Sequence, residues 1–146
     1  MKLNLPAFKH QLKKIEDKIY IYDIVRKKYI FLTPEEWVRQ HFTHFLINEY
    51  SYPKSLIATE RGLYYNSLQK RTDIVVYDRS GNPFLVIECK AAHIPIDQKV
   101  FNQVAMYNKI HQAPYVCVTN GMVHYCCKIN FENNDFEFLN NLPDFK

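Results

Sequence analysis

Hydrophobic residues recur with two different periods along the chain, and the switch between them predicts the order of the elements. Alternating apolar, β-branched and aromatic residues predict strands, whereas a repeat of three to four residues predicts a helix. The helical repeat follows Thr33 and returns over residues 97–112. Strands are predicted at residues 19–25, 29–32, 74–77, 84–89, 115–119, 122–131 and 135–139, and residues 54–60 and 62–68 form either a strand and a turn or two short strands.

The first helix is predicted from its own start signal. Thr33 has the residue type of an N-cap, Pro34 suits the first helical position, and Glu36 completes a capping box. The helix should run to about Tyr50, because Pro53 cannot continue it. The stripes expected to face the sheet are Val38, Phe42, Phe45 and Glu49 on this helix, and Val100, Val104 and either Tyr107 or Ile110 on the second.

This order of elements predicts one α/β domain built around a single mixed sheet. The chain has 146 residues, which is the length of one domain with one core. Residues 1–18 contain five lysines and are predicted to form a basic N-terminal arm or a short helix. The remaining residues, 19–146, are predicted to form the domain.

Composition narrows the range of functions. Apolar residues make up 47% and charged residues 23%, which excludes a disordered chain. Only three glycines are present, and no glycine-rich phosphate loop motif occurs. The net charge of +4 permits an anionic partner such as nucleic acid without requiring one. The four cysteines lie in apolar runs, and no apolar stretch reaches 18 residues, so we expect a cytoplasmic protein that has no membrane span.

The most informative stretch is a predicted hairpin around the loop at residues 79–82. Symmetric pairing of its strands places Asp73 opposite Glu88, with Cβ atoms about 5 Å apart. Residues two apart in a strand share a face, so Lys90 projects beside Glu88. The same register pairs Tyr77 with Phe84, Val75 with Val86 and Asp78 with Pro83.

Two carboxylates that face each other at the end of an apolar hairpin destabilise the fold unless something neutralises them. A divalent, oxygen-seeking cation such as Mg²⁺ would do so. Lys90 would then be close enough to stabilise or orient a water activated by the metal. The alternative is an ion network of Asp73, Lys90 and Glu88 that contains no metal.

Two further groups are candidates for this site. Glu35 lies on the apolar stripe of the first helix and should point toward the sheet, with Glu36 as the alternative if the helix has a different phase. A favourable charge at a helix N-terminus is the purely structural explanation. Gln103 and Tyr107 stand four apart on the second helix, where both could bond a phosphate, or could simply pack.

The ordered set of residues resembles the PD-(D/E)xK nuclease superfamily. Its core is Asp73 followed by Glu88-Cys89-Lys90 on a hairpin, with an acidic residue on the preceding helix and a QxxxY motif on the following one. The segments TPEEWVRQHF, KRTDIVVYD, LVIECKA and YVCVTNG resemble, more narrowly, the N-terminal nuclease domain of type I restriction enzyme R subunits. This resemblance covers about residues 20–140.

The resemblance implies a restriction-endonuclease-like αβββαβ core, with a mixed central sheet flanked by helices, plus an extra C-terminal β-hairpin. It also implies an endonuclease that cuts DNA with Mg²⁺, for which Mn²⁺ would substitute. Carried over to this chain, the metal ligands are Asp73, Glu88 and the Cys89 carbonyl, the other catalytic residues are Lys90, Glu35 and Gln103, and the DNA contacts are Gln103 and Tyr107.

Several hypotheses of function are compatible with the sequence. In the restriction subunit, helicase motor domains follow the nuclease, and this sequence contains no motor motif. The chain could therefore act alone, or together with a separate motor or specificity subunit. A homodimer would supply the two sites that cutting both strands requires. The alternative from another class is a non-catalytic module that keeps the nuclease fold and binds DNA or protein.

Overall fold

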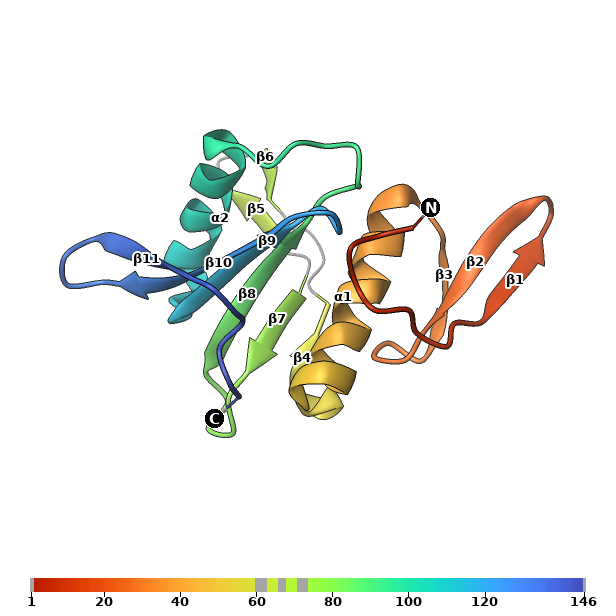
Figure 1. Ribbon diagram of the computed structural model, residues 1–146, viewed down its shortest axis with the longest axis horizontal. Coiled ribbons are helices and arrows are strands. Elements are labelled where there is room, and N and C mark those ends of the chain that lie inside the picture. The colour runs from red at the N-terminus through yellow and green to blue at the C-terminus, as the bar shows by residue number, and fades with distance from the viewer. Residues whose placement is uncertain (1, 60–62, 66–67, 71–73, 146) are drawn as a thin grey trace.

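A six-stranded mixed sheet forms the centre of the computed structural model, which describes residues 2–59, 63–65, 68–70 and 74–145 (Figure 1). The strand order is β11-β10-β9-β8-β7-β4, in which β8 and β9 are parallel and all other neighbours are antiparallel. The strands are β4 (Ile57–Ala58), β7 (Ile74–Tyr77), β8 (Pro83–Cys89), β9 (Tyr115–Thr119), β10 (His124–Asn130) and β11 (Asp135–Leu139). The predicted α/β class and the C-terminal hairpin, β10–β11, are confirmed.

Two helices cover opposite faces of this sheet (Figure 1). Helix α1 (Pro34–Tyr50) packs Phe42 and its apolar neighbours against a cluster that includes Ile87 of β8. Helix α2 (Gln98–His111) packs Val100 and Val104 in a second cluster that includes Val86. Alternate residues of β8 therefore enter different cores. Neither helix of the described part offers the apolar length that a membrane span needs.

The caps of both helices follow from the sequence. The Thr33 hydroxyl accepts a hydrogen bond from the Glu36 amide at 3.0 Å, as predicted, whereas the Glu36 carboxylate is engaged by other side chains. In α2 the N-cap is Asp97, which accepts from the Val100 amide at 3.1 Å. The buried Asn108 closes the far end through hydrogen bonds with the backbone of Ala113 in both directions.

The predicted helix stripes are partly wrong. Glu49 is exposed, and Leu46 fills the corresponding buried place on α1. On α2 the inward position near the end belongs to Asn108, whereas Ile110 is 55% exposed. Capping by Asn108 satisfies backbone groups at the helix end, so a polar side chain is stable at this buried position. The side chain of Tyr107, the other predicted inward residue, lies outside the described part.

The β7–β8 hairpin has the predicted register only over its apolar part. Val75 pairs with Val86 as expected. A bulge after Val76 pairs Tyr77 with Pro83, so the predicted pairing of Tyr77 with Phe84 is wrong. The cause is the turn, in which the Asp78 carboxylate accepts from the Ser80 and Asn82 amides, and the Asp78 amide itself donates to the Asn82 carbonyl rather than facing Pro83.

A separate three-stranded antiparallel sheet lies on the far side of α1 from the central sheet (Figure 1). It consists of β1 (Leu12–Ile15), β2 (Lys18–Asp23) and β3 (Lys28–Phe31). The helix considered for residues 1–18 is therefore wrong over β1, because Glu16 and Asp17 adopt positive φ angles and turn the chain into a hairpin. The remaining elements are a short 3₁₀ helix (Lys54–Leu56) and a two-stranded sheet of β5 (Leu63–Tyr65) and β6 (Leu68–Lys70).

The residues before β1 pack on the body of the protein. Leu3 is buried beside Gly121, where a Cβ atom would lie 3.0 Å from the Leu3 side chain and where φ is +85°. The Asn4 amide donates to the Gly121 carbonyl at 2.8 Å. Phe8 stacks on His44 of α1, with ring centroids 4.0 Å apart. The described part of the predicted basic arm is therefore attached at several points.

Candidate active site

The candidate site lies at the C-terminal end of β8, between β7 and β9. Glu88 is only 5% exposed and pairs in register with Val118 of β9. The Lys90 amide donates to the Thr119 carbonyl at 2.8 Å, so the chain stays against β9 beyond the last strand residue. Residues two apart on extended backbone share a face. Glu88 and Lys90 therefore both belong to the face that also carries Val86.

That face of the sheet is the one covered by α2. Val86 belongs to the same cluster as Val100 and Val104, so α2 lies over the strand positions that precede Glu88. Gln103 is half-buried on α2, next to Val104. The helix that carries Gln103 therefore covers the sheet face to which Glu88 belongs.

Two predicted residues cannot be placed in this geometry. Asp73 lies outside the described residues, as does the side chain of Tyr107. The pairing of Val75 with Val86 fixes the register of the described part of the hairpin, and this register continued by two residues puts Asp73 opposite Glu88. That pairing stays a prediction.

Glu35 belongs to the other layer. Its helix, α1, packs on the sheet face opposite to that of Glu88, and its carboxylate lies 3.8 Å from the Arg39 guanidinium. The first turn of α1 approaches the chain just past β8, where Ala92 and His93 help to line a pocket of about 350 Å³ with Thr33, Pro34 and Trp37. Glu35 could therefore reach the candidate site only around the end of the strand.

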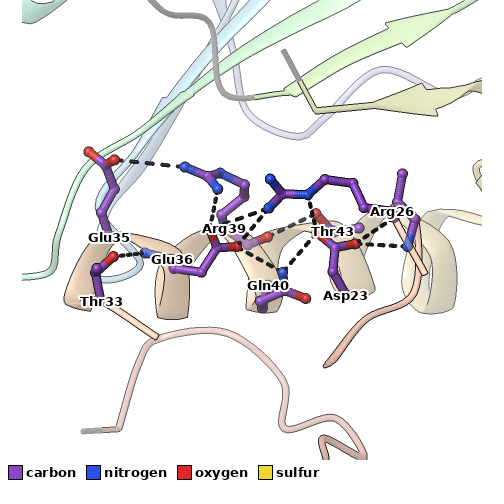
Figure 2. Close-up of polar contacts among 9 residues, drawn as sticks. Asp23, Arg26, Thr33, Glu35, Glu36, Arg39, Gln40 and Thr43 are labelled. Carbon is purple, nitrogen blue, oxygen red and sulfur yellow. Dashed lines mark hydrogen bonds and ion pairs between the residues drawn. The ribbon is translucent and has the colours of Figure 1, made fainter. Parts of the chain in front are cut away.

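The alternative acid, Glu36, points elsewhere. It is 4% exposed, and its carboxylate forms an ion pair with Arg39 and accepts a hydrogen bond from the Gln40 amide at 2.8 Å (Figure 2). Arg26, from the turn between β2 and β3, lies 3.4 Å from the same carboxylate. Glu36 is therefore part of a contact between α1 and the three-stranded sheet.

This contact is a buried polar network that the sequence analysis missed (Figure 2). Its second acid is Asp23, which accepts from the Arg26 side chain at 2.8 Å and from Gln40 at 3.2 Å. Arg39 and Gln40 follow Glu36 by three and four residues, and residues with this spacing meet on one helix face. The spacing could therefore have predicted their contacts with Glu36. The partners on β2 and its turn could not be read from spacing.

Asp23 makes part of the stability depend on pH. Burial opposes ionisation of its carboxyl, but hydrogen bonds and the positive charge from Arg26 outweigh burial and hold the pKa of Asp23 below its usual value. A lowered folded pKa stabilises the protein above the unfolded pKa, and this contribution is lost as the pH falls through the folded pKa.

We therefore expect the free energy of unfolding to fall below about pH 4 more steeply in wild type than in Asp23→Asn, by at most about 1.4 kcal/mol per pH unit. Urea unfolding of both proteins between about pH 5 and pH 2 measures the two slopes. Equal slopes would contradict the assigned role of Asp23.

The cysteines beside the site are buried free thiols. Cys89, Cys117 and Cys126 lie in the core on the α1 side of the sheet. A hydrogen bond with Cys126, together with burial, raises the pKa of Cys117, and burial raises the pKa of Cys127 to about 11. The Cys89 side chain lies on the sheet face opposite to that of Glu88, so the atom that Cys89 could offer a cation at the candidate site is its backbone carbonyl.

The donors near the strand end suit a hard cation. Carboxylate and carbonyl oxygens, here those of Glu88 and Cys89, are the ligands that Mg²⁺ prefers. Within the residues that the structure describes, His, Cys, Asp and Glu side chains do not gather in threes at any point where a metal could be held. A complete oxygen site at this position therefore depends on Asp73.

A six-stranded mixed sheet between two helices, with a buried glutamate two residues before a lysine at its central strand end, has the architecture of a restriction-endonuclease-like core. The same fold occurs in a solved fragment described as an HsdR subunit of a type I restriction enzyme from Vibrio vulnificus YJ016 (TM-score 0.53, 21% identity). That match covers 77% of this chain and 24% of the other, so this chain spans about a quarter of that protein's length.

The sequence also matches a protein family over most of its length. The profile of the family described as type I restriction enzyme R protein N terminus (HSDR_N) matches residues 34–143, and the chain belongs to this family. No curated protein matches the sequence. The matched residues include both helices and the central sheet, whereas β1, β2 and β3 lie before them.

Proposed function

We propose that this chain is a metal-dependent DNA endonuclease domain that hydrolyses phosphodiester bonds. The observation that carries the proposal is the buried Glu88 followed by Lys90 at the end of the central strand, in a chain of the R-protein family. Burying a carboxylate is costly unless a partner compensates for it. The place of this glutamate in an otherwise apolar strand supports a site that uses its charge.

Each residue has a distinct part in this proposal. Glu88, the Cys89 carbonyl and Asp73 would hold the cation. Mg²⁺, when bound, supplies a Lewis acid that activates a water and polarises the phosphodiester. Lys90 would orient the attacking water and stabilise the negative charge that develops on the phosphate.

The two helices would complete the site. Gln103 and Tyr107 of α2, which covers the face of Glu88, would contact the DNA backbone. Glu35 would border the site at the end of β8, where Arg39 restrains its carboxylate. The family also leads us to propose a motor or specificity subunit as a partner, since R proteins belong to type I restriction enzymes. The homodimer stays a prediction.

The test is nicking of supercoiled plasmid by the full chain with Mg²⁺, with Mn²⁺ and with EDTA. We expect nicking that requires either cation and that Glu88→Gln abolishes, because glutamine keeps the shape of the side chain but not its charge. Glu137→Gln, on the exposed face of β11, is the matched control and should retain activity.

Calorimetry separates the two function classes. Titration of Mg²⁺ into wild type should give a measurable heat of binding, whereas the same titration into Glu88→Gln or Asp73→Asn should give none. If wild type neither binds the cation nor nicks plasmid, the non-catalytic module that keeps the fold is the better description.

A further inference from the structure

The three-stranded sheet has one face against α1 and the other face toward solvent. Ile21 and Asp23 are buried on the inner face, where Gln40 of α1 bonds the Asp23 carboxylate. Residues that alternate with these point away from the protein body. Four aromatic side chains lie on this outer face, here called the aromatic platform: Tyr20, Tyr22, Tyr29 and Phe31.

The rings of the platform form two cross-strand pairs. Tyr20 and Phe31 are register partners with ring centroids 5.8 Å apart, and Tyr22 and Tyr29 are partners with centroids 5.3 Å apart. Tyr29 is 37% exposed and Phe31 is 47% exposed. A contiguous group of exposed rings marks an interaction surface, because apolar area left in water destabilises a folded protein.

Positive charge surrounds the platform. Lys13 and Lys18 lie on the same face, with their ammonium groups 5.4 Å from the centre of the Tyr29 ring and 5.8 Å from that of Phe31. Residues 1–33 contain eight basic and three acidic residues, a net charge of +5, whereas residues 34–146 contain 11 and 12, a net charge of −1. The basic excess of the chain therefore comes from the part that carries the platform.

We infer that the aromatic platform binds single-stranded DNA. Bases would stack on Tyr29 and Phe31, and Lys13 and Lys18 would exchange their weak contacts with the rings for phosphates of the strand. A single strand fits better than a duplex, because paired bases hide the faces that stack on aromatic rings. Opposite charge favours a nucleic acid over an apolar protein surface.

The inference goes beyond the proposed endonuclease and does not depend on it. The platform lies on the opposite side of α1 from the central sheet, and its strands precede the residues that match the family. Binding is therefore measured in EDTA, where no cation-dependent cleavage takes place. A chain without nuclease activity can still bind a single strand, and an active nuclease can fail to do so.

The experiment is fluorescence anisotropy of a labelled 20-residue oligothymidine titrated with the full chain. We expect Phe31→Leu to weaken binding about tenfold, because leucine keeps the apolar character but loses the ring that stacks. Phe31→Tyr should bind like wild type. Phe138→Leu, which removes an exposed ring from β11, is the matched control and should also bind like wild type.

The salt dependence tests the lysines separately. Each phosphate contact contributes about 0.7 to the slope of log K against log salt for single strands. Lys13→Gln with Lys18→Gln should therefore reduce the magnitude of this negative slope by about 1.4. Lys109→Gln with Lys128→Gln, which removes two exposed lysines elsewhere, should leave the slope unchanged.

Three results would overturn the inference. The first is a blunt 20-base-pair duplex that binds as tightly as oligothymidine, and the second is no binding of oligothymidine at all. The third is wild-type affinity in both Phe31→Leu and Tyr29→Leu. Thermal melting of each variant shows that it is folded, and because both side chains are exposed, their replacement leaves the core intact.

Discussion

Replacement of Lys90 by alanine is expected to lower the rate of plasmid nicking by about 100- to 1000-fold, the usual effect of removing one group that stabilises transition-state charge. The residue follows the buried Glu88 by two positions on backbone that β9 holds extended. Lys90 is half-buried and lies beyond the last residue of β8. Fold and DNA affinity should therefore change little.

The measurement is initial nicking rate under saturating Mg²⁺, with DNA affinity determined separately in Ca²⁺. Lys109→Ala, at an exposed position of α2, controls for the loss of one positive charge. Lys90→Arg keeps the charge and should retain more activity than Lys90→Ala. Wild-type rates in Lys90→Ala would remove this residue from the mechanism, and a loss confined to DNA affinity would make it a binding residue instead.

Replacement of Glu36 by glutamine is expected to lower the free energy of unfolding by up to about 3–5 kcal/mol, the usual effect of breaking a buried ion pair by removing one partner. Arg39 is 7% exposed, and its guanidinium pairs with the carboxylate that the substitution removes. Arg26 loses the same partner. The loss is a large share of the stability of an ordinary domain, which is about 5–15 kcal/mol.

Urea unfolding and thermal melting measure this loss. Glu49→Gln, an exposed site in the last turn of the same helix, is the matched control and should change stability by less than about 0.5 kcal/mol. The double variant Glu36→Gln, Arg39→Met should recover part of the stability, because it no longer buries the guanidinium group that has lost the Glu36 carboxylate. Equal stability of Glu36→Gln and Glu49→Gln would show that the network contributes nothing.

The sequence predicted those parts of the fold that local pattern determines. The start of α1 was predictable from Thr33 and Pro34, and the central hairpin from its apolar runs, because caps and burial act on residues close together in the chain. The bulge after Val76 was not predictable, since it depends on how Asp78 bonds the turn. Geometry at a turn decides register more than hydrophobicity does.

For the candidate site, strand alternation predicted that Glu88 and Lys90 share a face, and the structure puts α2 over the face that also carries Val86. The sequence did not reveal that α1 covers the other face, since a stripe of apolar residues shows that a helix packs but not on which side of a sheet. It also missed the buried polar network of Glu36, Arg39 and Gln40, because a buried polar helix face has the same sequence pattern as a solvated one.

The position of α1 between two sheets has a consequence for where the protein can be shortened. A chain trimmed to the family-matched residues, 34–143, would lack the strands that shield Gln40. It would also lack Asp23, which bonds Gln40, and Arg26, which pairs with Glu36. Leu3, which packs beside Gly121, would be lost as well. The segment that relatives share is thus smaller than the segment that must be expressed for α1 to keep its surroundings.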